Sequence, residues 1–136
     1  LINMHVESFL LADALRGVMA QRLLRPLCEK CRRPHEPTTA EIAALGEGLA
    51  GASFFEPRGC ASCHDTGYNG RFAIHEWVSA TAAIRELITN HASSDELRVK
   101  AEAEGMVTLQ QDALAKARKG MTSLAEILRV THQEAA

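Results

Sequence analysis

The sequence has 136 residues, of which 46% are hydrophobic and only 4% aromatic, with 15 basic and 17 acidic side chains. This length is enough for one domain or two small ones, and the hydrophobic fraction excludes wholesale disorder. The formal net charge of −2 excludes a general attraction to nucleic acid or acidic membranes. No apolar run approaches the roughly 18 residues that a membrane span needs, so we expect no membrane insertion. Because the chain begins at Leu1 rather than Met, we expect it to be part of a longer protein.

The first predicted element is an amphipathic helix over residues 6–24. Pro26 ends it, because a proline ring and its missing N–H cannot continue the hydrogen-bond ladder. The apolar side chains recur near i, i+4 and i+8 spacing and form one wide stripe; they are Leu10, Leu11, Ala14, Leu15, Val18, Met19, Leu23 and Leu24.

In the middle of the chain, the residue pattern predicts short helices and strands separated by turns. Thr38 and Glu41 have the spacing of a capping box, which predicts a short helix that ends before Gly46. Residues 53–56 and 71–78 predict two short strands, and the segment between them is dense in residues that favour turns.

The last part predicts four short helices, each with a polar cap and one apolar face. None of them would be stable alone in water, so we expect them to pack together as one helical subdomain. They cover residues 81–90, 93–104, 108–120 and 123–130.

Four cysteines form two C-x2-C pairs, Cys28 with Cys31 and Cys60 with Cys63. Such pairs are typical of a disulfide framework or of a metal site. No secretory signal is visible, and disulfides are rare in a reducing cytosol, so we favour the metal. Zinc prefers four tetrahedral ligands, and a tight x2 turn lets two thiolates point at one ion. The sequence therefore predicts a structural zinc site, since four thiolates leave no open position for catalysis.

Polar residues near the pairs allow further interpretations. His35 and His64 adjoin the pairs and could replace a cysteine as ligand, although a solvated neighbour is the commoner role. The basic segment between Arg16 and Arg33 fits a solvated face that balances the thiolates, or a contact with phosphates or an acidic partner. No interleaved aromatic residues support base stacking, so nucleic acid is not expected as a partner. The nearby cations that could offset the cluster are Lys30, Arg32, Arg33, Arg58 and Arg71.

Motifs for chemistry on a substrate are missing from these 136 residues. The sequence contains no G-x-x-x-x-G-K-[ST] phosphate loop and no G-x-G-x-x-G fingerprint. The remaining histidines, His5, His75, His91 and His132, are scattered, and we expect them to be surface or boundary residues. The chain by itself is therefore expected to catalyse nothing.

These elements predict a mainly α fold with a small β element. A zinc-knuckle subdomain over residues 28–78 is inserted between an N-terminal helix within residues 1–27 and a C-terminal helical subdomain over residues 79–136.

Three separated stretches resemble one protein family in order and spacing. They are RLLRPLCEKCRRPHEPT from Arg22, GCASCHDTGYNGRFAIHE from Gly59, and LRVKAEAEGMVTLQQDALAKARKGMTSLAEILRVT from Leu97. Together they resemble the C-terminal part of the type II secretion E-protein ATPases and the type IV pilus assembly ATPases. The resemblance covers nearly the whole chain and leaves open which of the two branches it belongs to.

The resemblance implies a role within a larger machine. The parent would be a hexameric, cytoplasmic ATPase, peripheral at the inner membrane, and residues 1–27 would continue from the end of its ATPase core. Cys28, Cys31, Cys60 and Cys63 match the family's tetracysteine zinc site. Arg71 matches the arginine of a G-Y-x-G-R stretch near the nucleotide, and Arg22 resembles another family arginine. ATP and Mg²⁺ would bind only in the full-length parent, whose partners would be other ring subunits and inner-membrane platform proteins.

Two other classes of protein compete with this interpretation. A freestanding zinc-knuckle module could bind protein or nucleic acid, but it leaves the helical tail unexplained. A nucleic-acid zinc ribbon usually has about 15 to 20 residues between its pairs, whereas here residues 32–59 separate them.

Overall fold

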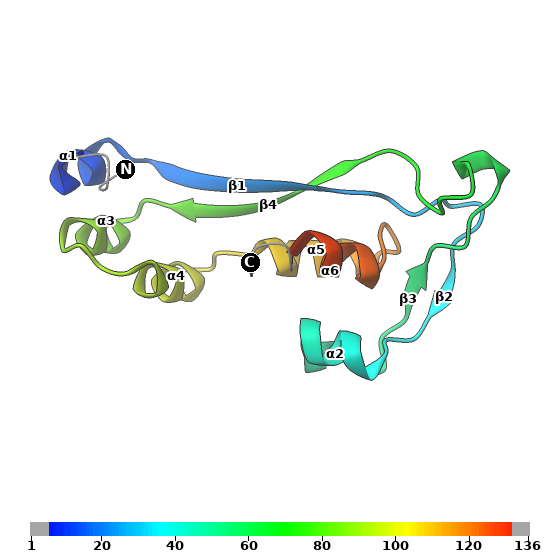
Figure 1. The fold of residues 1–136 in the computed structure, drawn as a ribbon. Helices are drawn as coiled ribbons and strands as arrows, with labels where there is room; N and C mark the ends of the chain where they lie inside the picture. The colour runs from blue at the N-terminus through cyan, green and yellow to red at the C-terminus, as the bar shows by residue number, and fades with distance from the viewer. Residues whose placement is uncertain (1–5, 132–136) are drawn as a thin grey trace. The chain divides into compact units, whose positions relative to one another are not determined.

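The computed structural model describes residues 6–131, so His5 and His132 lie outside the described residues (Figure 1). The chain divides into two compact units. Of the described residues, the first unit combines 6–20 with Glu76–Thr108, and the second unit combines Gln21–His75 with 109–131. The mainly α class with a small β element is confirmed by six α-helices and two two-stranded sheets among the described residues.

In the first unit, helix α1 (Ser8–Ala14) packs against α3 (Ala82–Thr89), which packs against α4 (Ser94–Ala103). The two later helices begin where the sequence predicts. The Thr81 hydroxyl accepts a hydrogen bond from the Ile84 N–H at 3.3 Å, and Ser93 with Glu96 forms a capping box. The buried core of this unit consists of Ala12, Ile84, Ile88 and Ala101.

The predicted helix over residues 6–24 is wrong beyond Ala14, because Gly17–Leu24 forms strand β1, which pairs with β4 (Phe72–Ser79). Two observations give the reason. A Cβ atom on Gly17 would lie 2.3 Å from the Trp77 ring, so the strand approaches this ring where only glycine fits. Val18, Met19 and Leu23 are 53%, 56% and 48% exposed, so their apolar spacing does not mark a buried helix face in this chain.

The second unit is built around a short antiparallel pair, β2 (Arg33–His35) and β3 (Phe54–Glu56). Helices α5 (Leu109–Arg118) and α6 (Leu124–Thr131) contact β3, and α2 (Thr39–Leu45) follows β2 in the chain and contacts α6 (Figure 1). The fully buried Phe54 lies in the core with Leu24, Leu45, Leu49, Ile74, Ala113, Ala117, Leu124, Ile127 and Val130. The predicted capping box of α2 is present, with the Thr38 hydroxyl and the Glu41 carboxylate each accepting from the other residue's backbone.

The four C-terminal helices do not pack as one subdomain, contrary to expectation. Helices α3 and α4 belong to the first unit, whereas α5 and α6 belong to the second. The reason is that α5 and α6 bury their apolar faces against β3, while α3 buries its apolar face against α1. The predicted strand over residues 71–78 is present as β4, and its residues are shared between the two units.

None of the helices in the described part of the chain is both long and apolar enough to cross a membrane.

Candidate metal centre

The first cysteine pair lies in a tight turn that follows β1. Leu27 forms an isolated antiparallel bridge with Tyr68, which brings this turn beside the second pair. The N–H groups of Cys31 and Arg32 both donate to the Cys28 carbonyl, at 3.2 and 3.0 Å. This turn satisfies the local backbone and lets both sulfur atoms project from the same side of the loop.

The second pair lies on a short 3-10 turn, Ala61–Cys63. The chain leaves this turn through two left-handed residues, His64 with φ 52° and Asp65 with φ 60°. The Asp65 N–H then donates to the Cys60 carbonyl at 2.9 Å. A left-handed exit closes the loop tightly and keeps backbone N–H groups near the sulfur atoms.

Gly67 joins the two pairs. Its carbonyl accepts a hydrogen bond from the Cys28 N–H at 2.9 Å, and its own N–H donates to the Cys63 sulfur at 3.2 Å. Its φ of +75° favours glycine, and an added Cβ atom would lie 2.3 Å from the Pro57 Cβ. Any other side chain would therefore collide with the segment that leads into the second cysteine pair and disturb the Gly67 hydrogen bonds to Cys28 and Cys63.

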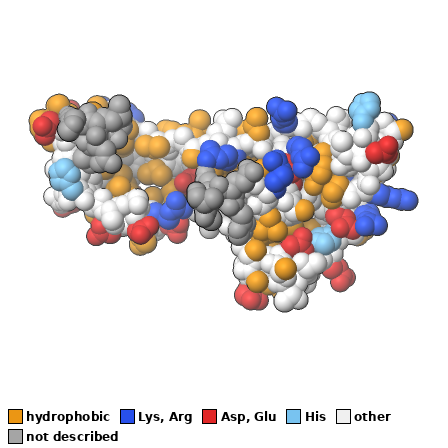
Figure 2. Space-filling model, in the orientation of Figure 1, with side chains coloured by type: hydrophobic (Ala, Val, Ile, Leu, Met, Phe, Trp, Pro, Cys, Tyr) orange, Lys and Arg blue, Asp and Glu red, His pale blue; other side chains and the backbone are white. Residues whose placement is uncertain are grey.

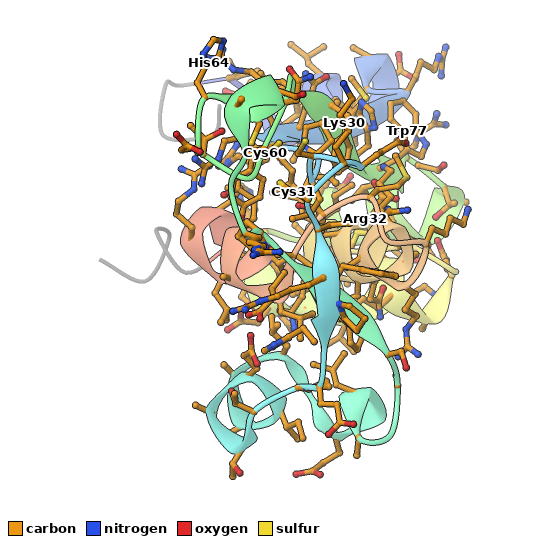
Figure 3. The ribbon with its side chains drawn as sticks, turned by 90° about the vertical axis from the view of Figure 1, so that its right-hand side faces the viewer. Lys30, Cys31, Arg32, Cys60, His64 and Trp77 are labelled. Carbon is orange, nitrogen blue, oxygen red and sulfur yellow. The ribbon has the colours of Figure 1, made fainter. Side chains whose placement is uncertain are left out.

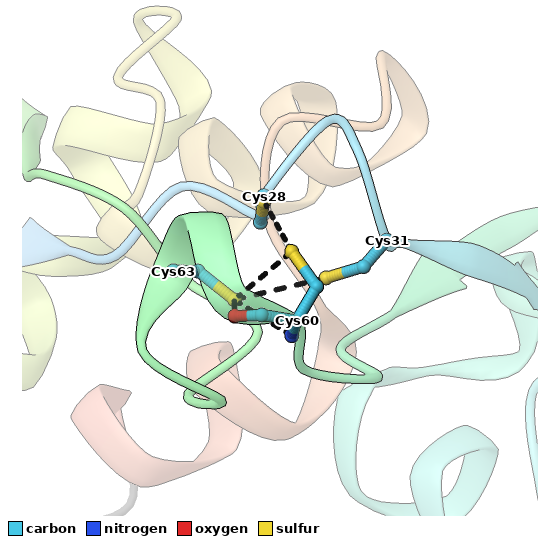
Figure 4. Close-up of side chains that lie close together, drawn as sticks. All are labelled: Cys28, Cys31, Cys60 and Cys63. Carbon is cyan, nitrogen blue, oxygen red and sulfur yellow. Dashed lines mark hydrogen bonds between the residues drawn. The ribbon is translucent and has the colours of Figure 1, made fainter.

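The four sulfur atoms form one cluster, within 4.8 Å of one another (Figure 4). The separations are 3.9 Å between Cys28 and Cys60, 3.8 Å between Cys31 and Cys63, and 3.7 Å between Cys60 and Cys63. A metal with four thiolates at about 2.3 Å in a tetrahedron places its sulfur atoms about 3.8 Å apart. The cysteine cluster therefore has the dimensions of a four-thiolate metal site.

A disulfide does not fit the cluster equally well. All four cysteines are free, and their separations are well beyond the roughly 2.05 Å of a sulfur–sulfur bond. In a pair of disulfides each sulfur would have a single bonded neighbour, whereas the sulfur atoms of Cys60 and Cys63 each lie close to two other sulfur atoms. The arrangement favours a shared central ion, and the four cysteines could hold one.

The protonation of the thiols differs across the cluster. Burial opposes ionisation of Cys63, but N–H groups of Cys60 and Gly67 and two neighbouring thiols outweigh it and lower the pKa of Cys63 to about 6. Burial, together with the three other thiols, raises the pKa of Cys31 to about 11 against the lowering effect of a backbone hydrogen bond from Gly59. A cation entering this site would therefore displace protons, as thiolate ligation requires.

The basic residues near the pairs have other partners. The Lys30 ammonium donates to the Ser62 hydroxyl at 3.2 Å, which links the two cysteine turns from outside. Arg32 stacks 4.7 Å over the Phe55 ring, and Arg33 pairs with Glu56 at 2.6 Å. Within residues 6–131 no cationic side chain donates to a cysteine sulfur. The negative charge expected on the thiolates is instead met by backbone N–H groups, those of Cys60 and Gly67, which donate to the Cys63 sulfur.

Neither histidine beside the pairs belongs to the cluster. The exposed His64 points outward, away from Cys31 and Cys60 (Figure 3). The His35 ring lies 2.9 Å from a Glu41 oxygen and 3.4 Å from a Glu56 oxygen, so both its nitrogens have carboxylate partners. Among the described residues, the group that could hold a metal is thus the four cysteines without either histidine.

The two arginines expected near a nucleotide lie in different surroundings. Arg71 precedes β4, is exposed, and makes no hydrogen bond or ion pair with another residue in the range 6–131. Arg22 is exposed on β1 and donates to the Gln21 carbonyl at 3.0 Å. Arg71, but not Arg22, lines two hollows on the second unit.

Sequence reasoning missed a buried carboxylate beside the cysteine turns. The Glu126 side chain is fully buried in α6 and pairs at 2.7 Å with both Arg25 and Arg129. Arg25 also stacks 4.3 Å over the Tyr68 ring, and the Tyr68 hydroxyl lies 2.7 Å from that of Ser123. One signal was available, because Glu126 lies four residues before the core residue Val130 and therefore on the same helix face.

Comparison with known proteins gives the family. The profile of the family described as "Type II/IV secretion system protein" matches residues 1–129. The chain is 39% identical to the type II secretion system protein E of Pseudomonas aeruginosa, over 98% of the chain and 27% of that protein. It is 42% identical to the protein of the same name from Aeromonas hydrophila, over 97% of the chain and 26% of that protein.

A second branch of the family is similarly close. The type IV pilus assembly ATPase PilB of Thermus thermophilus is 40% identical over 95% of the chain, which covers 15% of that protein. The chain therefore spans about a quarter or less of these relatives. Because the family profile matches nearly every residue, from the first strand through the cysteine cluster to α6, the chain belongs to the type II/IV secretion system protein family.

Proposed function

We propose that this chain is the zinc-bearing C-terminal part of an ATPase that powers type II secretion or type IV pilus assembly. One observation carries the proposal. Four sulfur atoms from two distant loops lie at tetrahedral spacing in a chain that the family profile matches almost completely. Four thiolates bind zinc in preference to a hard cation. A site whose four positions are all filled by thiolates has no open position for a substrate. The metal would therefore hold the fold rather than take part in hydrolysis.

The function of this part of the ATPase is structural. The 136 residues contain no phosphate-loop motif, so the catalytic phosphate loop would lie in the remaining length that the relatives have. The parent would assemble as a cytoplasmic hexamer, peripheral at the inner membrane. The chain described here would contact other ring subunits and inner-membrane platform proteins, and ATP with Mg²⁺ would bind to the parent.

Arg71 is the residue of this chain that we propose to reach nucleotide phosphates in the assembled parent. It is exposed and has no partner in the described chain, so its charge is available to an external anion. A guanidinium is always charged and can bind a phosphate through two N–H groups at once. Arg22 is the second candidate, since it lies exposed on β1 in the same unit.

Metal analysis of the purified chain tests the zinc part of the proposal. We expect one zinc ion per chain by inductively coupled plasma spectrometry, with zinc lost in Cys63→Ser and retained in Glu29→Gln. Glu29 is the matched control, because it neighbours a ligand and is exposed. A chain that folds equally well without zinc would refute a structural metal.

Turnover by the full-length parent tests the arginine. Arg71→Ala should reduce ATP hydrolysis while zinc content stays unchanged, and Arg58→Ala should reduce neither. Arg58 is an exposed arginine of the same unit without a side-chain partner among residues 6–131. Loss of zinc together with turnover in Arg71→Ala would mean that Arg71 supports the fold instead.

A further inference from the structure

We propose that Arg25, Arg71 and Arg129 together form a binding site for an oligophosphate group. This inference rests on the proposed phosphate contact of Arg71 and extends it to two residues with no role in that proposal. Arg25 lies directly after β1, Arg71 directly before β4, and Arg129 in α6. The three arginines line one hollow of about 400 Å³ together with Leu23.

A second hollow continues this basic surface. It measures about 580 Å³ and shares Arg25 and Arg71 with the first hollow. Its other lining residues are Thr66, Tyr68, Asn69 and Gly70, from the loop that follows the second cysteine pair. In Figure 2 several Lys and Arg side chains lie close together near the centre of the view, while Asp and Glu side chains lie along the lower edge and toward both ends. An extended anion could therefore lie along both hollows while contacting the same two guanidinium groups.

Glu126 holds two of the arginines in place. Its carboxylate accepts the Arg25 backbone N–H at 3.0 Å, two N–H groups of the Arg25 side chain at 3.1 and 2.7 Å, and two of Arg129 at 2.9 and 2.7 Å. With five donors, this carboxylate has no further capacity to accept hydrogen bonds. Its charge therefore orients the two guanidinium groups, and it leaves their other N–H groups available to an anion.

The two oriented guanidinium groups keep unused donors. Each guanidinium has five N–H groups, and each spends two of them on Glu126. The rest have no acceptor in residues 6–131, and the two side chains are 43% and 48% exposed. Tyr68 supports Arg25 through its ring, at 4.3 Å from the guanidinium carbon. Pre-oriented donors lose less freedom when an anion binds, which raises affinity.

The ligand class follows from charge and donor number. Three cations facing one saturated carboxylate leave an excess of positive charge that a single carboxylate ligand would not neutralise. A chain of phosphates carries several charges and three acceptor oxygens on its terminal group, which matches planar, bidentate guanidinium donors. Both nucleotide phosphates and free oligophosphates share this chemistry.

Calorimetry on the zinc-loaded chain tests the site, with sodium tripolyphosphate as the probe at low salt. We expect saturable binding that weakens about tenfold in Arg71→Ala and in Arg129→Ala, because each removes charged donors. Arg98→Ala, which removes an exposed arginine of the first unit, should bind as tightly as wild type. ATP should compete with tripolyphosphate and adenosine should not, which separates phosphate recognition from base recognition.

Three results would overturn the proposal: no binding, equal weakening in Arg98→Ala, or wild-type binding in Arg71→Ala. Arg71 has no partner whose loss could unfold the chain, so its variant remains informative if Arg129→Ala loses structure. The proposed function can be refuted by a separate result. If Arg71→Ala leaves turnover of the parent unchanged while the chain still binds tripolyphosphate, the site stands and the nucleotide contact does not.

Discussion

Replacing Glu126 by Gln should lower the free energy of unfolding of the second unit by about 2 kcal/mol at pH 7. Burial opposes ionisation of this carboxyl, but hydrogen bonds from Arg129 and Arg25 outweigh it and lower its pKa from 4.5 to about 2. Each pKa unit corresponds to about 1.4 kcal/mol, so the network favours the ionised form by about 3 kcal/mol. Both guanidinium groups are nearly half exposed, and water screens part of this gain.

Urea denaturation of the zinc-loaded chain measures the effect, followed through the backbone amide signals of α6. Glu102→Gln is the matched control, because Glu102 is exposed on α4 and has no side-chain partner in the described chain. We expect this control to stay within about 0.5 kcal/mol of wild type. If Glu126→Gln does the same, the network does not stabilise the fold and the reasoning is refuted.

Further predictions concern pH, the metal and two local backbone features. Because the pKa of Glu126 is lower in the folded chain, the difference in unfolding free energy between wild type and Glu126→Gln should be complete above pH 4.5 and decline as pH falls toward 2, measured by urea titration. Chelation should lower the free energy of unfolding by roughly 10 kcal/mol, and amide hydrogen exchange should accelerate first in residues 28–75. An equal acceleration along the whole described chain would contradict this. Gly67→Ala should weaken zinc affinity in chelator competition, whereas Gly51→Ala should not, because Gly51 has a similar φ of +73° but open space around it. Thr38→Ala should cost about 1 kcal/mol in thermal unfolding through loss of the α2 cap.

Features that depend on a few neighbouring residues could be predicted from the sequence. The capping box of Thr38 and Glu41 and the cysteine turns each act through hydrogen bonds made within the segment itself. Spacing along the chain is therefore enough to identify them. The clustering of the two pairs was also predictable, because four thiolates on one ion have a known geometry.

Features that depend on distant partners could not be predicted in the same way. Strand β1 has a helical apolar pattern, but its geometry is decided by pairing with β4 and by the ring of Trp77 against Gly17. The division of the C-terminal helices follows from which of them meets Phe54, a residue far earlier in the chain. Glu126 is buried and ionised because Arg25, which is distant in the sequence, lies beside it in the fold together with Arg129.

The cysteine cluster ties the chain at two points, so residues 32–59 form a closed loop once a metal is bound. A cross-link of this kind acts mainly on the unfolded chain, by removing conformations that the open loop would explore. Loop closure depends only weakly on loop length, and added Cβ atoms at Gly46 and Gly51 meet nothing within 4 Å. A site directly beside Gly51, after the buried Leu49, is therefore where a peptide tag or a fluorophore could be inserted while the metal preserves the register of both ends.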